Sequence, residues 1–99
     1  MGRAVPDPEL PVPGPDVVAR RVDQEVVLVN LQSNRIFALN STGARFWELL
    51  AGGAARTEIE NALAEEFEAS PEEIRASIDA LVEELRVERL VQDRRPPAS

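Results

Sequence analysis

EVVLVNLQSNRIFAL, residues 25–39, is the stretch of sequence that decides the fold. It holds two runs rich in β-branched and aromatic residues, 25–30 and 35–39, on either side of the polar Gln32-Ser33-Asn34. Such runs separated by a polar turn are typical of a β-hairpin. A third run of this kind, residues 17–22, precedes them and ends at a polar turn, Asp23-Gln24. We therefore predict a three-stranded antiparallel meander, with the nearly continuous apolar run 25–30 as its central strand.

The hydrophobic period changes after residue 40 and predicts helices in the second half of the chain. Asn40 or Ser41 is suited to cap a first helix that runs to Leu50, and Gly52-Gly53 is suited to end it. Thr57-Glu58-Ile59-Glu60 has the form of a capping box and predicts the start of a second helix. The apolar residues of this helix recur every four positions, which gives it one buried face: Ile59, Leu63 and Phe67.

Ser70-Pro71-Glu72-Glu73 is a stronger start, because serine is the cap, proline takes the first helical position and glutamate the third. The apolar residues of this third helix fall on one face: Ile74, Ile78, Leu81, Val82 and Leu85. Leu90-Val91 then returns to the core, where Trp47 is also expected. Three strands followed by capped helices predict an α+β fold similar to a winged helix-turn-helix, with a three-stranded antiparallel sheet followed by three helices.

The two ends of the chain have a different composition from the middle. Five of the eight prolines lie between residues 6 and 15, so residues 1–16 are expected to form a proline-rich flexible N-terminal arm. Residues 92–99 carry no apolar pattern and are expected to form a flexible tail. One domain, residues 17–91, is left between them, as the length of 99 residues also suggests.

The composition excludes several kinds of chemistry. The chain has no cysteine and no histidine, so thiol catalysis, zinc fingers and histidine-based acid–base catalysis are excluded. Glu65, Glu66 and Glu68 are best interpreted as a solvated helix face, since no nucleophile or phosphate-binding loop accompanies them. We therefore expect a protein that is not an enzyme, with no catalytic residues, no metal and no cofactor. No apolar run is long enough to span a membrane and no signal peptide is recognisable, so a cytoplasmic location is expected.

The charge argues against nucleic acid as a partner. The net charge is −7, and residues 57–89 alone contain eleven acidic side chains against three arginines. Residues 17–40, by contrast, carry a net charge of +1. A recognition helix needs cations toward the phosphate backbone, so a winged-helix transcriptional regulator is kept only as the alternative function.

The third strand offers another way to bind a partner. Residues 35–39 lack most of the charged and proline residues that usually protect the edge of a sheet. An extended peptide could add there as a fourth strand, held by main-chain hydrogen bonds. Packing of this strand under a helix is an equally good interpretation of the residues alone. Pairing of two copies through this edge, which would give a homodimer, is a further alternative.

Several of these residues, in this order, resemble the PqqD-like family. The resemblance rests on Glu25-Val26-Val27-Leu28-Val29-Asn30, on the junction Leu39-Asn40-x-Thr42-Gly43, and on Trp47-Glu48-Leu49-Leu50, and it covers residues 17–91. Members that act in the pyrroloquinoline-quinone pathway typically carry a Leu-Tyr-Pro-Glu-like second strand. This chain has Leu28-Val29-Asn30-Leu31 and no tyrosine. That departure points to the branch that acts in lasso-peptide and related pathways.

The resemblance implies a peptide recognition element, which binds the leader of a ribosomally made precursor and presents the precursor to maturation enzymes such as a leader peptidase. It implies that the leader adds beside the third strand and lies against the third helix. The implied strand-side residues are Asn34, Arg35, Ile36, Phe37, Ala38 and Leu39. The implied helix-side residues are Arg75, Ile78, Asp79, Val82, Glu83 and Arg86. A Tyr-x-x-Pro element, common in lasso leaders, would suit an apolar pocket formed by Phe37, Ile78 and Val82.

Overall fold

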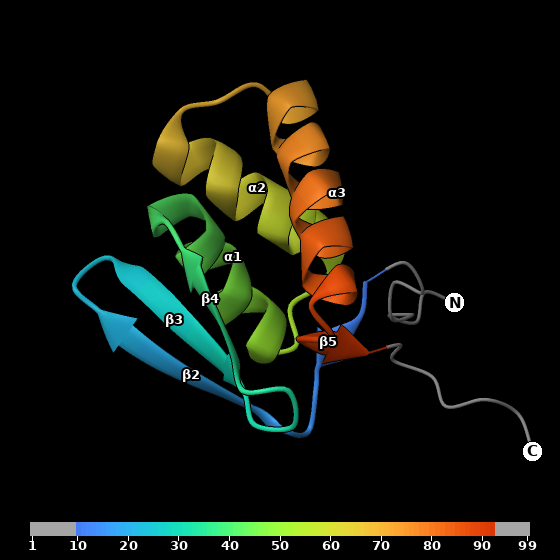
Figure 1. Ribbon diagram of the computed structural model, residues 1–99. Helices are drawn as coiled ribbons and strands as arrows, with labels where there is room; N and C mark the ends of the chain where they lie inside the picture. The colour runs from blue at the N-terminus through green and yellow to red at the C-terminus, as the bar shows by residue number, and fades with distance from the viewer. Residues whose placement is uncertain (1–9, 93–99) are drawn as a thin grey trace, which may run out of the picture.

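The computed structural model describes residues 10–92 and contains one three-stranded sheet and three helices (Figure 1). The sheet is antiparallel, in the order β2-β3-β4, with strands β2 (Val17–Val22), β3 (Glu25–Asn30) and β4 (Arg35–Leu39). The helices follow it in sequence: α1 (Ser41–Ala51), α2 (Arg56–Phe67) and α3 (Pro71–Val87). The predicted α+β fold, with a meander followed by three helices, is confirmed.

The helices cover only one face of the sheet. Val26 and Leu28 of β3 are buried on the face against which α1 packs, and Leu39 of β4 pairs with Val26 on that same face. Val18 and Ile36 lie on the opposite face and are 47% and 70% exposed. This is the alternation expected of a sheet with one face on the core and the other in water.

Polar turns join the strands as the sequence predicts. Asp23, between β2 and β3, has φ 57°, and Asn34, between β3 and β4, has φ 61°. Asp and Asn tolerate this left-handed conformation better than most residues, which is why they are common in tight turns. The register that follows pairs Leu28 with Phe37 and Asn30 with Arg35.

Two of the three predicted helix starts are confirmed. Asn40 caps α1, and its Oδ1 accepts a hydrogen bond from the backbone N–H of Gly43 at 2.9 Å. Ser70 caps α3, with its Oγ accepting from the N–H of Glu73 and the Glu73 carboxylate accepting from the N–H of Ser70, both at 3.1 Å. This reciprocal pair satisfies two donors that the first turn of a helix otherwise leaves unpaired.

The predicted start of α2 is wrong by two residues. The helix begins at Arg56 with Ala55 as its cap, and Thr57 lies inside the first turn. Glu58 accepts a hydrogen bond from the N–H of Ala55 at 3.0 Å, so the acidic half of a capping box is kept without a side-chain cap. Glu60, the expected partner of Thr57, instead binds the Arg56 guanidinium at 2.8 Å.

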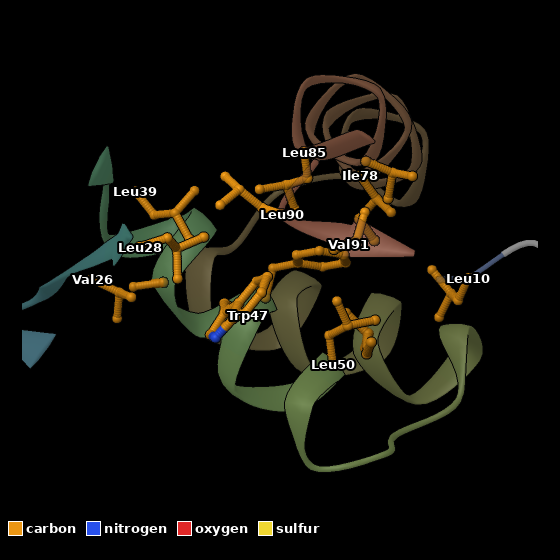
Figure 2. Close-up of a cluster of buried hydrophobic side chains, with 14 of the residues drawn as sticks. Leu10, Val26, Leu28, Leu39, Trp47, Leu50, Ile78, Leu85, Leu90 and Val91 are labelled. Carbon is orange, nitrogen blue, oxygen red and sulfur yellow. The ribbon is translucent and has the colours of Figure 1, made fainter. Parts of the chain in front are cut away.

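The core lies between the sheet and the helices, and all three helices contribute to it (Figure 2). Trp47 and Leu50 of α1 and Leu28 of the sheet belong to one cluster, in which Trp47 lies beside Leu28. Ile78 and Leu85 of α3 close this cluster from the other side. Trp47 is 5% exposed, so its expected place in the core is confirmed. Phe67, expected on the buried face of α2, is 36% exposed at the end of that helix.

The ends of the domain are more ordered than the proline pattern predicts. Leu10 is 1% exposed, β1 (Val12–Pro13) pairs antiparallel with β5 (Val91–Gln92), and the N–H of Gly14 donates to the carbonyl of Leu90 at 3.0 Å. The expected flexible arm is therefore wrong for residues 10–16, and the expected tail is wrong for Gln92. Burial of Leu10 stabilises this segment, and a two-residue ladder tolerates Pro13 because its missing N–H lies at an edge. The rest of both expectations, residues 1–9 and 93–99, lies outside the described residues.

Asn30 ties the β3–β4 turn to the end of α3. Its side chain is buried, with the whole residue 5% exposed, and its Oδ1 accepts hydrogen bonds from the N–H groups of Gln32 at 2.9 Å and Ser33 at 3.2 Å. Its Nδ2 donates to the carbonyl of Arg89 at 2.9 Å. Because Arg89 follows α3 and Asn30 ends β3, this residue fixes the sheet hairpin relative to α3.

Within residues 10–92, no helix is both long and apolar enough to cross a membrane. The same part of the chain holds no group of three or more acidic, histidine or cysteine side chains placed to bind a metal ion.

Candidate functional site

The free edge of β4 faces a groove in front of α3. β4 pairs with β3 along one edge, and no strand among residues 10–92 pairs with its other edge. Figure 1 shows α3 on the side of β4 away from β3. Between the two lies a hollow of about 410 Å³, which we call the β4–α3 groove. Its wall on the strand side is Phe37, Ala38 and Leu39, its floor is Asn40, Thr42 and Gly43, and its wall on the helix side is Ser77, Ala80, Leu81 and Glu84.

The strand wall combines apolar side chains with unpaired main-chain groups. Phe37 is half-buried and Leu39 is buried, and both lie on the core face of the sheet. An edge strand leaves every second N–H and C=O group unpaired, so it can accept another extended chain in the same sheet. The strand wall can therefore supply main-chain hydrogen bonds and apolar contact at once.

The floor is shaped by a close approach of α1 to β4. A Cβ atom added at Gly43 would lie 3.2 Å from Leu39 Cδ2 and 3.3 Å from Leu39 Cβ. Those distances are shorter than ordinary carbon contacts, so a side chain at position 43 would require the Leu39 side chain or the start of α1 to shift. The junction Leu39-Asn40-x-Thr42-Gly43 thus sets the shape of this end of the groove.

The helix wall is made of small or partly exposed side chains. Ser77 and Ala80 are exposed and short, and Leu81 is half-buried against the core. Short side chains on this face leave room between α3 and the strand. Glu84 is exposed and, among residues 10–92, is the one charged residue that lines the groove.

An ion pair joins β4 to the end of α3 beyond the groove. Arg35 Nε lies 2.9 Å from Glu88 Oε1, and Arg35 Nη2 donates to Glu88 Oε2 at 3.1 Å. The two parallel bonds are the forked geometry that arginine and carboxylate prefer. Arg35 is the first residue of β4 and Glu88 is the C-cap of α3, so the pair connects the two walls at this end.

The structure brings together some of the residues that the sequence assigned to a site and separates others. On the strand, Phe37, Ala38 and Leu39 line the groove, whereas Asn34, Arg35 and Ile36 do not. On α3, none of the six assigned residues lines it. Ile78 and Val82 are core residues, 1% and 9% exposed, and they do not line the groove beside Phe37.

The other assigned residues of α3 lie elsewhere. Asp79 binds the Arg56 guanidinium at 2.7 Å, which places it on the side of α3 that faces α2. Arg75 and Glu83 are exposed outside the groove. Arg86 lines a second, more polar hollow of about 490 Å³, together with Asp16, Asn30 and Arg89.

The sequence reasoning missed Ser77, Ala80, Leu81 and Glu84, although the buried stripe of α3 gave a partial signal. Residues 77, 81 and 84 lie immediately before Ile78, Val82 and Leu85 in sequence, and so lie along one flank of the buried stripe. The assigned Asp79, Glu83 and Arg86 lie along the other flank. Periodicity places both flanks beside the stripe but does not say which of them faces β4.

Arg56 holds α3 from the side opposite the groove. Its side chain is 13% exposed and bridges Glu60 of α2 and Asp79 of α3. Burial lowers the pKa of the Arg56 guanidinium, but hydrogen bonds and charge attraction from Glu60 and Asp79 outweigh it, and the net pKa is raised above its ordinary value. Arg56 is therefore a permanently charged link between the two helices.

Comparison with known proteins agrees with this geometry. The family model described as "Coenzyme PQQ synthesis protein D (PqqD)" matches residues 25–91. No curated protein matches the chain significantly. A solved structure, "TbiB1 in Complex with the TbiA(beta) Leader Peptide", matches with a TM-score of 0.78 and 27% sequence identity, over 89% of this chain and 99% of that one. The family match includes β3, β4, the junction, all three helices and Val91 of β5, and so takes in both walls of the groove. The chain therefore belongs to the PqqD family.

Proposed function

We propose that this protein binds the leader segment of a ribosomally synthesised precursor peptide. The leader adds as a fourth strand along the free edge of β4, and its side chains that point inward occupy the β4–α3 groove. The observation that carries the proposal is an unpaired strand edge beside an apolar groove, in a fold whose solved relative is described with a leader peptide.

The size and lining of the groove suit a peptide better than a small polar metabolite. A hollow of about 410 Å³ with Phe37, Leu39 and Leu81 in its walls has room for one large side chain or two smaller ones. Strand addition gives an affinity that depends little on sequence, and the pocket then selects the side chain. A tyrosine followed by proline, as in a Tyr-x-x-Pro element, would suit this arrangement, with the aromatic ring near Leu81 in place of the buried Val82.

The further steps of the proposal follow from what the protein offers. It supplies a binding surface and leaves the chemistry to maturation enzymes, so we propose that it is not a catalyst and presents the precursor to a leader peptidase. The similarity to TbiB1 and the absence of the Leu-Tyr-Pro-Glu-like second strand favour a lasso pathway. All of these steps belong to the cytoplasm, where precursors are made.

The alternative, a winged-helix transcriptional regulator, is disfavoured by α3 itself. The helix that would enter a DNA groove contains five acidic residues and two arginines. Its electrostatic field would repel phosphates, which supply most of the affinity in nucleic-acid binding. Sequence-selective shifts of duplex DNA in a gel at low salt would support a regulator, and we expect none.

The test uses a fluorescein-labelled leader peptide, taken from the short precursor gene nearest to the gene for this protein. Fluorescence polarisation should give saturable binding by the full chain. Ala80→Trp, which fills the groove from an exposed position, should weaken binding at least about tenfold, or about 1.4 kcal/mol.

Ala76→Trp is the matched control, because Ala76 is an exposed alanine of the same helix that does not line the groove. Equal binding by both variants would contradict the proposed site, and no binding by the wild type would contradict the function. Sedimentation of the complex tests the homodimer. Strand addition to β4 predicts a complex of one protein monomer with one leader, because the leader occupies the edge through which two copies would pair. A dimer that persists with saturating leader would favour pairing of two copies.

A further inference from the structure

Glu84 combines two features: its carboxylate has no partner in the part of the chain described, and it lines the β4–α3 groove. The carboxylate of the adjacent Glu83 has no partner there either, but Glu83 lies outside the groove. Glu88 is held by Arg35, Asp79 by Arg56, and the Glu73 carboxylate by the N–H of Ser70. The Glu84 carboxylate makes no hydrogen bond or ion pair with any residue between 10 and 92, although the backbone carbonyl of Glu84 accepts from the N–H of Glu88 at 3.0 Å. Its carboxylate is thus the uncompensated charge of a site that is otherwise apolar or neutral.

Arg35, the cation on β4, already pairs with another carboxylate. Arg35 makes two bonds to Glu88, one helical turn beyond Glu84. Releasing Arg35 to neutralise Glu84 would leave Glu88 without its partner, with no net gain of ion pairs. The compensation for Glu84 has to come from whatever fills the groove.

Covering the groove would remove water from one side of Glu84. Removing water from a carboxylate that gains no hydrogen-bond donor in return is several times more unfavourable than removing water from a neutral group in the same place. A positively charged donor offsets this loss best, because hydrogen bonds between opposite charges are roughly twice as strong as those between neutral groups. The protein's net charge of −7 would also raise the rate at which a cationic segment meets the groove.

We propose that Glu84 selects leaders that carry a lysine or arginine in the segment lying across the end of the groove nearest Arg35. This inference rests on the proposed function and adds the chemistry of the residue that is recognised. Phe37 and Leu81 bind the apolar part of the leader, and the Glu84 carboxylate pairs with a positively charged side chain beside it. The substrate class is therefore an extended peptide with an apolar side chain and a nearby cation, which an acidic leader segment would not match.

The experiment is a charge exchange between protein and peptide. The labelled leader is made with each of its lysines and arginines replaced in turn by glutamine and by glutamate. Each peptide is titrated with the wild type, Glu84→Gln and Glu84→Lys. Glu83→Gln and Glu83→Lys are matched controls, since Glu83 is the adjacent exposed acid and does not line the groove.

We expect Glu84→Gln to weaken binding of the unmodified leader by about tenfold, and replacement of one particular cation by glutamine to weaken binding to the wild type by a similar factor. Combining the two changes should cause little further loss. Glu84→Lys should bind the leader with glutamate at that position better than the wild type does. The Glu83 variants should bind as the wild type does, and all variants should melt within a few degrees of one another, since glutamate, glutamine and lysine have similar helix propensity.

Two results would overturn the proposal and leave the proposed function in place. If the wild type binds the leader but the Glu84 and Glu83 variants bind it equally well, Glu84 does not select a cation, and the proposed function still stands. If a leader without any lysine or arginine binds the wild type as tightly as one with them, the cation is not recognised. Failure of the wild type to bind any leader would instead remove the proposed function and this inference together.

Discussion

At the scale of single residues, Asn30 has a structural role that its position at the end of a strand does not predict. A polar residue after an apolar run is ordinarily a turn residue in water, and the sequence places Asn30 just before the turn at residues 32–34. The structure buries its side chain, whose four hydrogen bonds join that turn to the carbonyls of Glu88 and Arg89 at the end of α3. Arg89 is 59 residues away in the chain, so no local pattern reveals it.

We predict that Asn30→Ala lowers the free energy of unfolding by about 2–3 kcal/mol. The substitution removes a buried side chain and leaves the N–H groups of Gln32 and Ser33 and the carbonyl of Arg89 without their partner, and each such loss costs about 1–3 kcal/mol when the group stays buried. Urea unfolding followed by circular dichroism measures the change.

Asn30→Asp separates the two ends of this interaction. The aspartate keeps the acceptor for Gln32 and Ser33 but loses the amide that donates to Arg89. It should therefore also destabilise the protein, because a carboxylate would face a carbonyl. A variant as stable as the wild type would show that the Arg89 bond contributes nothing.

At the scale of the elements, α3 has a core face and two flanks that the sequence could not tell apart. The apolar period correctly identified Ile74, Ile78, Val82 and Leu85 as one stripe, and all four are buried. Leu81 was placed in that stripe as well, but it lies half-buried on the flank that faces β4. The choice between flanks depends on how α3 lies relative to the sheet. That placement is set by packing against α2 and β5 and by the bond from Asn30 to Arg89, so no pattern within α3 reveals it.

We predict that substitutions in the stripe and on its flank separate stability from binding. Ile78→Val should lower the free energy of unfolding by about 1 kcal/mol, as expected for one buried methylene, and leave leader affinity unchanged. Leu81→Ala should weaken leader binding by about tenfold while the protein stays folded at 25 °C. Urea unfolding and fluorescence polarisation give the two quantities, and loss of affinity in Ile78→Val with none in Leu81→Ala would contradict the assignment.

The α2–α3 contact makes a prediction about pH. Arg56→Gln should lower the free energy of unfolding by about 1–2 kcal/mol, because Glu60 and Asp79 lose a largely buried cation. The folded-state pKa of Arg56 is raised, so its stabilising effect is complete below the ordinary pKa of arginine and is lost only as the pH rises through the higher folded-state value. The loss in Arg56→Gln should therefore be the same at about pH 6 and about pH 9.

Urea unfolding of both proteins at the two pH values measures this difference. Thr57→Ala provides a comparison, since Thr57 lies in the same first turn of α2 and makes no side-chain hydrogen bond among residues 10–92. A loss in Arg56→Gln that disappears on raising the pH to about 9 would mean that Arg56 is not the group responsible.

At the scale of the whole molecule, the sequence predicted the parts whose causes are local. Three strands, two of the three caps and the buried Trp47 follow from patterns within a few residues. The proline-rich segment was misjudged from residue 10 onward because its order comes from β5, about 80 positions later in the chain. The sequence predicted only the strand wall of the groove, because that wall follows from a local pattern. The helix wall depends on the packing of the complete fold, which no local pattern shows.

The distribution of charge is also a property of the whole molecule, and it has opposite consequences for folding and for binding. Acidic residues outnumber arginines by 18 to 11, and most of the ion pairs between residues 10 and 92 are exposed, as for Arg45 with Glu66. Exposed pairs contribute about 0–1 kcal/mol each and are screened by salt. Repulsion among the excess acidic groups is screened as well, and it is spread over the entire surface.

We predict that raising NaCl from about 0.1 M to about 1 M stabilises the fold and weakens leader binding, because the Debye length falls from about 10 Å to about 3 Å. Relief of repulsion should exceed the loss of the exposed pairs, and a gain of about 1 kcal/mol would raise the Tm by about 4–8 °C in a domain of this size. Over the same range the leader Kd should rise severalfold in the wild type and less in Glu84→Gln, since that variant has already lost the charge in the groove.

Thermal melting and fluorescence polarisation at matched salt concentrations measure both effects. A melting temperature that falls with salt would show that the ion pairs dominate, and an equal salt dependence in the wild type and Glu84→Gln would show that the attraction comes from the protein's overall charge and not from the groove.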